Sequence, residues 1–526
     1  MRADAHVVLV GLPGSGKSTV GPLLARRLQR DFVDTDAEVE ARLGASPEVI
    51  FAKMGEARFR AEERRVIEGA LASPRPLVIA AGGGLVAHPG AIDTLRREAT
   101  VVFLDAGDDQ LLTRLGAEAS GRPLLAARPG TALRHLRAAR EWAHGHAQLR
   151  VGADGTADEV ADHIVRCLAG SVRVATAHPY LVRVAPGVAD RVAEHVPVTA
   201  RRVAVIADEA VLACAEAIAG RLRTERLSAT VIPIAGGERA KQWSIAGLLI
   251  ERCSDLGLDR DDCIVAVGGG SVGDVAGLVA ATYLRGIAWL VVPTTLLAMV
   301  DSAVGGKTAV NLRRGKNLAG VFWQPRAVLC DPVLLDTLSE RSFRSAFAEI
   351  VKSSMVGGDA LAQLVDSRIA AGLARDGDAL ADLVRGCCAL KAEVVAADER
   401  ETGRRAILNY GHTVGHAVEA LSGFGTGLDH GEAVAFGMRV AGTLSVAASG
   451  CPRDDVAHQD DLLDACGLSE RPRLSETDIV AHLGTDKKAR AGVPRWVLLR
   501  RRGDPVTGIV VEAAAITGAV AEALVA

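Results

Sequence analysis

Short apolar runs separated by longer amphipathic stretches make up residues 1–168. The runs His6–Val10, Phe32–Val33, Leu77–Ala81 and Thr100–Leu104 predict four strands. Apolar strands that alternate with helices are typical of a parallel sheet covered by helices on both faces. We therefore predict a three-layer α/β domain with a parallel sheet for this part of the chain.

The pattern changes near residue 170, where a second series of apolar runs begins. Its predicted strands are Arg202–Ile206, Ala229–Ile234, Cys263–Val267 and Ala288–Val292. After Ser339 such runs become rare, and long amphipathic segments rich in Ala, Leu and Val predict helices. The predicted organisation is an α/β domain at 1–168, a linker at 169–178, a second α/β domain at 179–338 and a mostly helical domain at 339–526.

Composition narrows the function classes. The chain has 526 residues, 49% of them hydrophobic and 24% charged, as expected of a folded protein with several domains. A net charge of −3 and an aromatic content of 3% give no reason to expect binding to nucleic acid. No apolar run reaches the roughly 18 residues of a membrane span. The nine cysteines form no CxxC pair, so we expect reduced core residues of a cytoplasmic protein.

The nucleotide-binding pattern GxxxxGK[ST] occurs in full at Gly11 to Thr19, between a predicted strand and a predicted helix. Glycines at such a turn let backbone N–H groups face phosphate oxygens, and the helix N-terminus favours an anion. The pattern predicts that Lys17 reaches the β- and γ-phosphates of ATP and that the Ser18 hydroxyl binds Mg²⁺. The predicted ATP-binding residues of this loop are Gly14, Ser15, Gly16, Lys17, Ser18 and Thr19.

Residues suited to an acceptor substrate follow the loop. Asp34 and Asp36 come at the end of a strand, where carboxylates can hold Mg²⁺ and a substrate hydroxyl. Arg60 lies on a predicted helix, and the run Gly82-Gly83-Gly84 permits close approach of a ligand to the backbone. Taken singly, these residues are more often surface carboxylates, a helix-face arginine and a turn.

Taken together and in this order, the motifs resemble shikimate kinase over residues 5–165. The resemblance implies that Asp36, Arg60, Gly83 and Arg140 bind shikimate, with Asp36 and Lys17 catalytic. It also implies that Asp34 acts with Ser18 near Mg²⁺, and that Arg122 belongs to a lid and contacts ATP. One departure is Trp142-Ala143-His144, where the family usually has Pro-Leu-Tyr.

Two further motifs lie in the second half of the chain. Gly268-Gly269-Gly270-Ser271-Val272-Gly273-Asp274 follows a strand and satisfies GxGxxG, but no acidic residue ends the next strand, so dinucleotide contacts must differ from the usual fingerprint. His412 and His416 share one face of a predicted helix, as metal-binding histidines often do. With His430 and Glu349 they make four candidate ligands, and spacing does not decide which three bind.

Long segments of this half resemble 3-dehydroquinate synthase over residues 175–510. The implied zinc (or cobalt) ligands are Glu349, His412 and His430, and His416 is then an acid/base group rather than a ligand. The resemblance also implies a homodimer. The segments that carry it are Pro293 to Leu297, Asp301 to Asn311, Gly315 to Asn317, Ala348 to Lys352, Leu408 to His416 and His430 to Val434.

The same resemblance implies the remaining site residues of this half. Lys307, Lys352, Asn409, Arg405 and His416 would be catalytic. The implied substrate-binding residues are Asp301, Lys307, Lys316, Lys352, Lys391, Arg405, Asn409, His416 and one of Lys487 or Lys488. The implied NAD-binding residues are Gly237, Glu238, Lys241, Gly270, Ser271, Val272, Gly273, Asp274, Thr294, Thr295, Lys307, Lys316, Leu334, Leu335, Asp336 and Thr337.

The distribution of lysine agrees with this constellation. Of 61 basic residues only nine are lysines, and apart from Lys17 and Lys53 all of them fall on it. A chain so rich in arginine that keeps lysine at these positions indicates a need for a compact ammonium group.

The sequence therefore predicts two activities. One is phosphorylation of shikimate by ATP, and the other is conversion of 3-deoxy-D-arabino-heptulosonate 7-phosphate to 3-dehydroquinate and phosphate with NAD and zinc. Two alternatives remain: a metal-dependent polyol dehydrogenase in the C-terminal half, and a non-catalytic nucleotide-binding module in the N-terminal half. So many cations disfavour a neutral polyol, and the intact kinase residues disfavour an inactive module.

Overall fold

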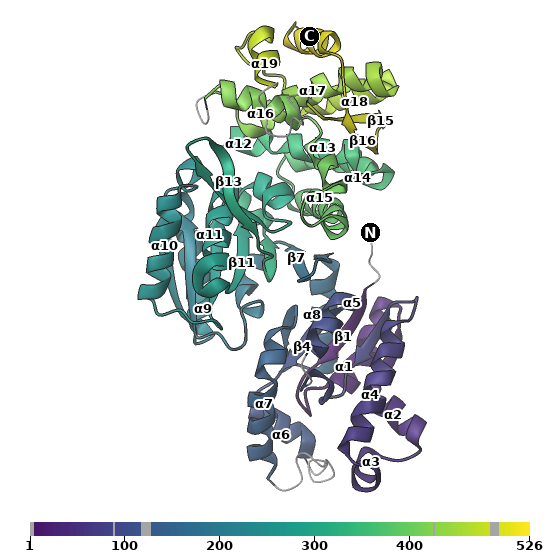
Figure 1. Cartoon of the computed structure of the whole chain (residues 1–526). Coiled ribbons are helices and arrows are strands. Elements are labelled where there is room, and N and C mark those ends of the chain that lie inside the picture. Colours follow the sequence, from purple (N-terminus) through teal and green to yellow (C-terminus); the bar gives the residue numbers. More distant parts are fainter. Residues whose placement is uncertain (1–4, 88–89, 117–127, 424–426, 484–493, 526) are drawn as a thin grey trace.

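The computed structural model describes residues 5–87, 90–116, 128–423, 427–483 and 494–525. Three parts follow one another along the chain: an α/β part, a second α/β part and a helical part (Figure 1). No helix among the described residues is both long and apolar enough to cross a membrane.

The first part is built on a parallel five-stranded sheet in the order β2-β3-β1-β4-β5. Its central strands are fully buried, as their apolar sequences predict, and helices cover both faces. The strands are β1 (His6–Val10), β2 (Asp31–Asp34), β3 (Leu77–Ala80), β4 (Ala99–Asp105) and β5 (Leu149–Gly152), and the helices are α1 (Lys17–Leu28), α2 (Thr35–Leu43), α3 (Pro47–Met54), α4 (Glu56–Leu71), η1 (Leu85–Ala87), α5 (Ala91–Glu98), α6 (Asp108–Leu115), α7 (Pro129–Gly145) and α8 (Ala157–Ala169).

The second part holds a seven-stranded sheet in the order β6-β7-β14-β11-β10-β8-β9. All neighbouring strands are parallel except β6 and β7, which are antiparallel. Strand β6 lies inside the stretch predicted as a linker. The strands are β6 (Ser171–Val174), β7 (Tyr180–Val184), β8 (Arg202–Asp208), β9 (Ser228–Ile234), β10 (Cys263–Gly268), β11 (Ala288–Pro293) and β14 (Ala327–Cys330), with a separate hairpin of β12 (Lys307–Leu312) and β13 (Gly315–Phe322).

Helices pack on both faces of this second sheet, and several short helical turns lie in the segments that connect its strands and helices. One of these turns, η7, is a π-helix at Ala298–Ser302. The helical elements are η3 (Val188–Glu194), η4 (Glu209–Val211), α9 (Leu212–Thr224), η5 (Gly237–Arg239), α10 (Trp243–Asp255), α11 (Gly270–Thr282), η6 (Tyr283–Arg285), η7 and η8 (Pro332–Thr337).

The third part is mostly helical, as predicted, although it also contains a hairpin that the sequence pattern did not indicate. Helix α17 is buried along most of its length and forms the centre of this part. The elements are α12 (Glu340–Ser345), α13 (Phe347–Val356), α14 (Asp359–Leu373), α15 (Gly377–Ala397), η9 (Arg404–Asn409), α16 (His412–Leu421), α17 (His430–Ser449), α18 (Arg453–Ala465), α19 (Glu476–Leu483), β15 (Trp496–Arg501), β16 (Asp504–Ile509) and α20 (Ala513–Val525).

The first part is docked on the second by polar and apolar contacts. Arg326 donates to the carbonyl oxygens of Gly145 at 2.6 Å and Ala147 at 3.3 Å, at the end of α7. Arg96 of α5 donates to the carbonyl of Pro179 at 2.9 Å. Leu181 of β7 is buried in the hydrophobic core of the first part, so the two parts share packing as well as hydrogen bonds.

Candidate active sites

The predicted phosphate-binding loop lies between β1 and α1. Gly14 and Gly16 have φ of 83° and 93°, a conformation that favours glycine. The Lys17 ammonium donates to the carbonyls of Gly11 at 2.9 Å and Leu12 at 3.2 Å, so its side chain lies along the loop. Ser15 is buried, whereas Ser18 is exposed at the start of α1. The loop lines one side of a cleft of about 1000 Å³ that also contains Asp34, Asp36, Arg60, Gly83 and Arg140.

The glycine run after β3 leaves room for three predicted acceptor residues. A Cβ atom on Gly82 would lie 2.3 Å from an Asp36 carboxylate oxygen, and one on Gly84 would lie 1.7 Å from Nη1 of Arg60. At Gly83 it would lie 2.8 Å from Nη1 of Arg140. Side chains therefore pass where these glycines have none, which explains why the run is needed.

The acceptor side combines arginines with a buried carboxylate. Arg60 donates to Glu63 at 2.9 Å and to Glu56 at 3.1 Å. Arg140 is 3% exposed, and its Nη1 has no hydrogen-bond partner among the described residues. Burial, together with the charge of Arg60, lowers the pKa of Arg140 to about 10. A buried guanidinium with an unused donor is suited to a ligand carboxylate.

Asp34 ends β2 and caps helix α2. Its Oδ1 accepts hydrogen bonds from the backbone N–H groups of Asp36 at 3.1 Å and Ala37 at 3.4 Å. Both bonds end on the same oxygen, so the second carboxylate oxygen is left to the cleft that Asp34 lines. Arg122, the predicted lid residue, lies outside the described residues.

The departure Trp142-Ala143-His144 lies in the last turn of α7, and the helix runs through it. Ala143 and His144 are buried, and the His144 ring stacks on Phe103 with centroids 4.3 Å apart. Burial lowers the pKa of His144 to about 3, so its imidazole is neutral. Trp142 faces outward and contacts His146. The altered sequence is thus accommodated by packing beside Arg140.

The glycine motif of the second part begins helix α11 at the carboxyl end of β10. A Cβ atom on Gly269 would lie 3.2 Å from the Thr295 methyl group, and one on Gly270 would lie 2.5 Å from the Ser302 hydroxyl. The predicted residues Gly270, Gly273, Asp274 and Lys307 line one hollow. Lys241 forms an ion pair with Asp274, and Glu238 pairs with Lys316 at 3.1 Å.

Other predicted NAD residues lie beside this hollow or away from it. Ser271 and Val272 are in the first turn of α11, Gly237 is in η5, and Thr294 donates its backbone N–H to Gly268 at 2.9 Å. The turn η8, which holds Leu334, Leu335, Asp336 and Thr337, does not line the hollow.

An acidic residue that the sequence analysis missed lies next to the glycine motif. Asp208 ends β8, the strand that pairs with β10. A Cβ atom on Gly268 would lie 3.2 Å from Cβ of Asp208, and one on Gly236 would fall on its carboxylate, at 2.0 Å. The sequence analysis considered only the strand that follows the glycine motif, whereas Asp208 ends an earlier strand, β8. The run Asp208-Glu209 after a buried strand was the available signal.

Three predicted metal ligands converge from three helices. Glu349 is on α13, His412 begins α16 and His430 begins α17. The Nε2 atoms of His412 and His430 lie 3.4 Å and 3.5 Å from Oε1 of Glu349. Both Glu349 oxygens are buried, Oε2 faces the Lys352 ammonium, and the three ligand atoms lie within 4.8 Å of one another. A divalent cation would satisfy these atoms.

The fourth candidate, His416, lies next to the cluster but outside it. Its ring centroid is 5.2 Å from that of His412 and 6.3 Å from that of His430. Burial holds the pKa of His412 well below its usual value, which keeps the ring neutral, as a metal ligand must be.

Glu419, which the sequence analysis also missed, connects the metal cluster to a lysine. Its carboxylate lies 3.3 Å from Nδ1 of His430 and accepts a hydrogen bond from Lys316 at 2.8 Å. Burial opposes charge on His430, but the Glu349 and Glu419 carboxylates outweigh it and raise the pKa of His430 to about 10. Glu419 follows His412 by seven residues, so helical spacing was the signal that could have found it.

Cations and carboxylates alternate around the metal cluster. Lys352, 2% exposed, pairs with Glu349, and Lys391 pairs with Asp301 at 2.6 Å. Lys307 pairs with Glu401, a further residue the sequence analysis did not select.

Two more predicted substrate residues complete the described site. Asn409 donates to Glu401 at 3.2 Å. The buried Arg405 guanidinium donates to the carbonyl of Glu399 at 2.7 Å. Lys487 and Lys488 lie outside the described residues.

Three family models match separate stretches of the chain. They are shikimate kinase over residues 13–169, 3-dehydroquinate synthase N-terminal over residues 231–345 and 3-dehydroquinate synthase C-terminal over residues 346–489. A 3-dehydroquinate synthase from Pelobacter propionicus is 47% identical over 307 residues, which are 58% of this chain and 85% of the relative.

Two solved structures of other synthases are similar to about two thirds of the chain. A 2-deoxy-scyllo-inosose synthase complexed with carbaglucose-6-phosphate, NAD⁺ and Co²⁺ is 28% identical, with a TM-score of 0.62, and the match covers 67% of this chain and 99% of that one. A 2-epi-5-epi-valiolone synthase from Streptomyces hygroscopicus subsp. jinggangensis with NAD⁺ and Zn²⁺ bound is 26% identical, with a TM-score of 0.60, over 65% of this chain and 96% of that one.

Proposed function

Because the chain belongs to the 3-dehydroquinate synthase family and carries a shikimate kinase domain before its synthase domains, we propose that its two sites use the residues described above for two separate reactions. The chain is a bifunctional enzyme of the shikimate pathway. It phosphorylates shikimate with ATP, and it converts 3-deoxy-D-arabino-heptulosonate 7-phosphate to 3-dehydroquinate and phosphate. These matches favour that conclusion over a polyol dehydrogenase or a non-catalytic nucleotide-binding module.

In the kinase site, Asp36 accepts a hydrogen bond, and then the proton, from the 3-hydroxyl of shikimate as that oxygen attacks the γ-phosphate of ATP. Arg140 and Arg60 hold the shikimate carboxylate and ring, and the backbone at Gly83 lies against the ring. Lys17 stabilises the negative charge on the transferred phosphoryl group, which is the main catalytic contribution in such reactions. Support comes from the shared cleft that these residues line.

Magnesium enters this site with ATP. Ser18, at the start of α1, and Asp34, at the end of β2, are the oxygen ligands the chain offers, and hard oxygen ligands are what Mg²⁺ prefers. The ion neutralises charge on the β- and γ-phosphates. Arg122 is the proposed lid residue that contacts ATP.

In the synthase site, Glu349, His412 and His430 are the proposed ligands of zinc or cobalt. The observation that carries this assignment is the convergence of one buried carboxylate and two imidazoles, whose donor atoms all lie within 4.8 Å of one another. A divalent ion at these ligands supplies Lewis-acid polarisation of a substrate oxygen. His416 lies close enough to exchange a proton with a substrate bound at these ligands, but it is not itself one of them.

The hollow at the start of α11 is the proposed NAD site. Gly269 and Gly270 pack closely against Thr295 and Ser302 where the backbone enters α11, and the N-terminus of this helix suits a pyrophosphate. NAD⁺ supplies a transient oxidation of a ring alcohol that acidifies the neighbouring C–H bond, so that phosphate can be eliminated. Asp208 is added to the proposed contacts, for a ribose hydroxyl.

The cations of the synthase site are proposed to bind the phosphate and carboxylate of the substrate. In the structure Lys307, Lys316 and Lys391 are each paired with a carboxylate of the protein. A dianionic phosphate competes with these internal partners, whereas a neutral polyol cannot. The same cationic environment stabilises the phosphate as it leaves.

Crossed variants test the assignment of the two sites. Asp36→Asn is expected to abolish shikimate phosphorylation and to leave phosphate release from the heptulosonate substrate unchanged. His430→Ala is expected to show the opposite pattern. Both reactions are measured on the same purified full-length proteins. Phosphorylation that survives Asp36→Asn would contradict the acceptor-site assignment.

Assembly and location complete the proposal. We propose that the chain forms a homodimer through its synthase part, as the family resemblance implies. Light scattering coupled to gel filtration measures the oligomeric state. The cytoplasm is the proposed location, supported by nine unpaired cysteines, of which all but Cys214 are buried.

A further inference from the structure

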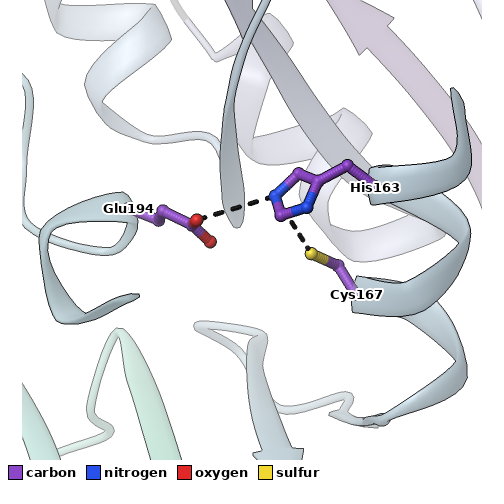
Figure 2. Close-up of side chains that lie close together, drawn as sticks. All are labelled: His163, Cys167 and Glu194. Atoms are coloured by element: carbon purple, nitrogen blue, oxygen red, sulfur yellow. Dashed lines mark hydrogen bonds and ion pairs between the residues drawn. The ribbon is translucent and has the colours of Figure 1, made fainter. Parts of the chain in front are cut away.

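A second group of metal-binding side chains lies where the kinase domain meets the synthase. His163 and Cys167 are one turn apart on α8, the last kinase helix, and Glu194 ends η3 of the synthase. Figure 2 shows the three side chains pointing toward one another across the junction. Nε2 of His163 lies 3.6 Å from Sγ of Cys167 and 3.6 Å from Oε1 of Glu194, and the donor atoms all lie within 4.8 Å.

These separations fit a tetrahedral zinc ion. Zinc bonds of about 2.0 Å to nitrogen and about 2.3 Å to sulfur place a nitrogen and a sulfur ligand roughly 3.5 Å apart. An imidazole, a thiolate and a carboxylate are the ligand types zinc takes, and the last two supply negative charge that matches the ion. We propose that His163, Cys167 and Glu194 form a second zinc site, which joins the kinase domain to the synthase domain.

One neighbouring arginine supports the ligands from outside. Arg183, which is buried, donates from Nη1 to Oε2 of Glu194 at 2.8 Å and from Nη2 to Sγ of Cys167 at 3.0 Å. Its Nη1 also lies 3.1 Å from Nε2 of His195. It therefore holds the carboxylate by the oxygen that does not face His163, and it also contacts the Cys167 sulfur.

The second neighbouring arginine, Arg191, lies on the solvent side of the cluster, where the proposed ion would bind. Nη1 of Arg191 lies 2.9 Å from Oε1 of Glu194, and 3.2 Å and 3.4 Å from the two ring nitrogens of His163. Its side chain is 47% exposed, so it can turn into solvent when an ion binds. The side chains of His163 and Glu194 are 18% and 21% exposed, which leaves a path for the ion and a fourth position for water.

An ion at this position would couple the two domains. Its ligands come from residues on both sides of the junction, next to the antiparallel pair β6–β7 that carries the chain across. We expect zinc to raise the unfolding temperature of the kinase domain in the full chain, because undocking would require a metal ligand to be lost.

Cobalt binding tests the proposal, because a thiolate-to-cobalt charge-transfer band in the near ultraviolet reports only a sulfur ligand. The synthase ligands Glu349, His412 and His430 include no sulfur. Metal-free full-length protein titrated with Co²⁺ is expected to bind two ions and to show this band for one of them. Cys167→Ser should remove the band, and Cys214→Ser, the matched control at a half-buried cysteine, should keep it.

Absence of the band in the unaltered chain, or a band that persists in Cys167→Ser, would overturn the proposal and leave an ion-pair network at the junction. Should Cys167→Ser fail to fold, Glu194→Gln keeps the thiol and removes one ligand. That variant is expected to bind the second Co²⁺ at least tenfold more weakly, and unchanged affinity would equally overturn the proposal.

Discussion

The kinase site and the synthase site bind phosphorylated compounds with opposite arrangements of charge. The kinase cleft is open, relies on backbone glycines, and has an arginine, Arg140, with an unused donor. In the synthase site each described lysine is already paired with a carboxylate of the protein. The kinase thus offers a buried donor at Arg140 that is ready for a ligand, although its Arg60 is paired with Glu56 and Glu63. In the synthase we propose that the substrate's anions replace internal partners.

The cation types differ accordingly. In the proposed sites, planar arginines are expected to bind the shikimate carboxylate in the kinase, and compact lysines lie beside the proposed metal ligands of the synthase. Replacing a lysine of the synthase site by arginine, or displacing an arginine of the kinase site, should therefore lower the activity of that site and leave the activity of the other site unchanged.

The largest effect is expected for Lys352→Arg. Lys352 is 2% exposed and pairs with the proposed metal ligand Glu349, so the larger guanidinium has to displace that carboxylate. Displacement of a reacting group by about 1 Å costs roughly 10²-fold in rate, and we expect at least that loss in synthase kcat/KM. Steady-state phosphate release measures it. Lys53→Arg, at an exposed lysine, is the control, and full activity of Lys352→Arg would refute the need for lysine.

A comparable but smaller change is expected in the kinase for Gly84→Ala. The added methyl group would lie 1.7 Å from Nη1 of Arg60, so the arginine must move. We expect the KM for shikimate to rise by about 10- to 100-fold while the KM for ATP is unchanged. Gly69→Ala, on the same helix as Arg60 with no atom within 4 Å of the new carbon, is the matched control. An unchanged KM for shikimate would separate Arg60 from the acceptor site.

Acid should destabilise the kinase domain through its buried histidine, His144. His144 of the kinase stacks on a ring, and burial lowers its pKa from 6.5 to about 3. Because the unfolded chain binds this proton more readily, the folded kinase loses stability as the pH falls below about 6.5, by roughly 2 kcal/mol at pH 5. His144→Phe should lose less stability over this range in urea unfolding experiments. His135→Phe, on the exposed face of the same helix, should behave like the unaltered chain, and equal acid sensitivity of both variants would argue against a buried neutral His144.

The smallest effect is expected for Glu419→Gln, a positioning change at the synthase metal site. The amide keeps the shape of the side chain but weakens the contacts to His430 and Lys316. Loss of such a group typically lowers metal affinity by about 10- to 100-fold, and we expect the lower end of that range. Competition with a chelator measures the affinity. A merely structural role would leave it unchanged, and Glu419→Asp should not restore it fully because the carboxylate is withdrawn.

Much of the architecture could be predicted because the central strands are apolar on both faces. The predicted runs at His6–Val10 and Cys263–Val267 lie in strands with the same first residue. The hairpins β12–β13 and β15–β16 were missed. Strands β12, β13 and β16 are partly exposed and lack a long apolar run, whereas β15 has a buried apolar run of only four residues that was not recognised as a strand in a segment predicted to be helical. Domain boundaries stay a prediction, and β6 shows that residues between two domains can join a sheet.

Some residues of the two sites could be predicted from the sequence, and others could not. Motif residues such as Lys17 and the pair His412 and His416 could be selected because their spacing in sequence reflects a local turn or helix, whereas Glu349 was assigned as a ligand through the family resemblance. Partners such as Glu401, Glu419 and Asp208 were missed, because only the fold shows which lysine, histidine or glycine each of them meets. Helical spacing and the end of a buried strand made Glu419 and Asp208 candidates without naming their partners. The cluster at the domain junction belongs to the same class, since Glu194 meets His163 across a domain boundary.

Phosphate release from 3-deoxy-D-arabino-heptulosonate 7-phosphate by the purified chain tests the central claim most directly. The account predicts release that requires NAD⁺, stops after chelation, returns with zinc and proceeds without net accumulation of NADH. Shikimate phosphorylation in the same preparation should continue with ATP and magnesium after the zinc is removed. No phosphate release, together with NADH accumulating on simple polyols, would contradict the account and indicate a dehydrogenase.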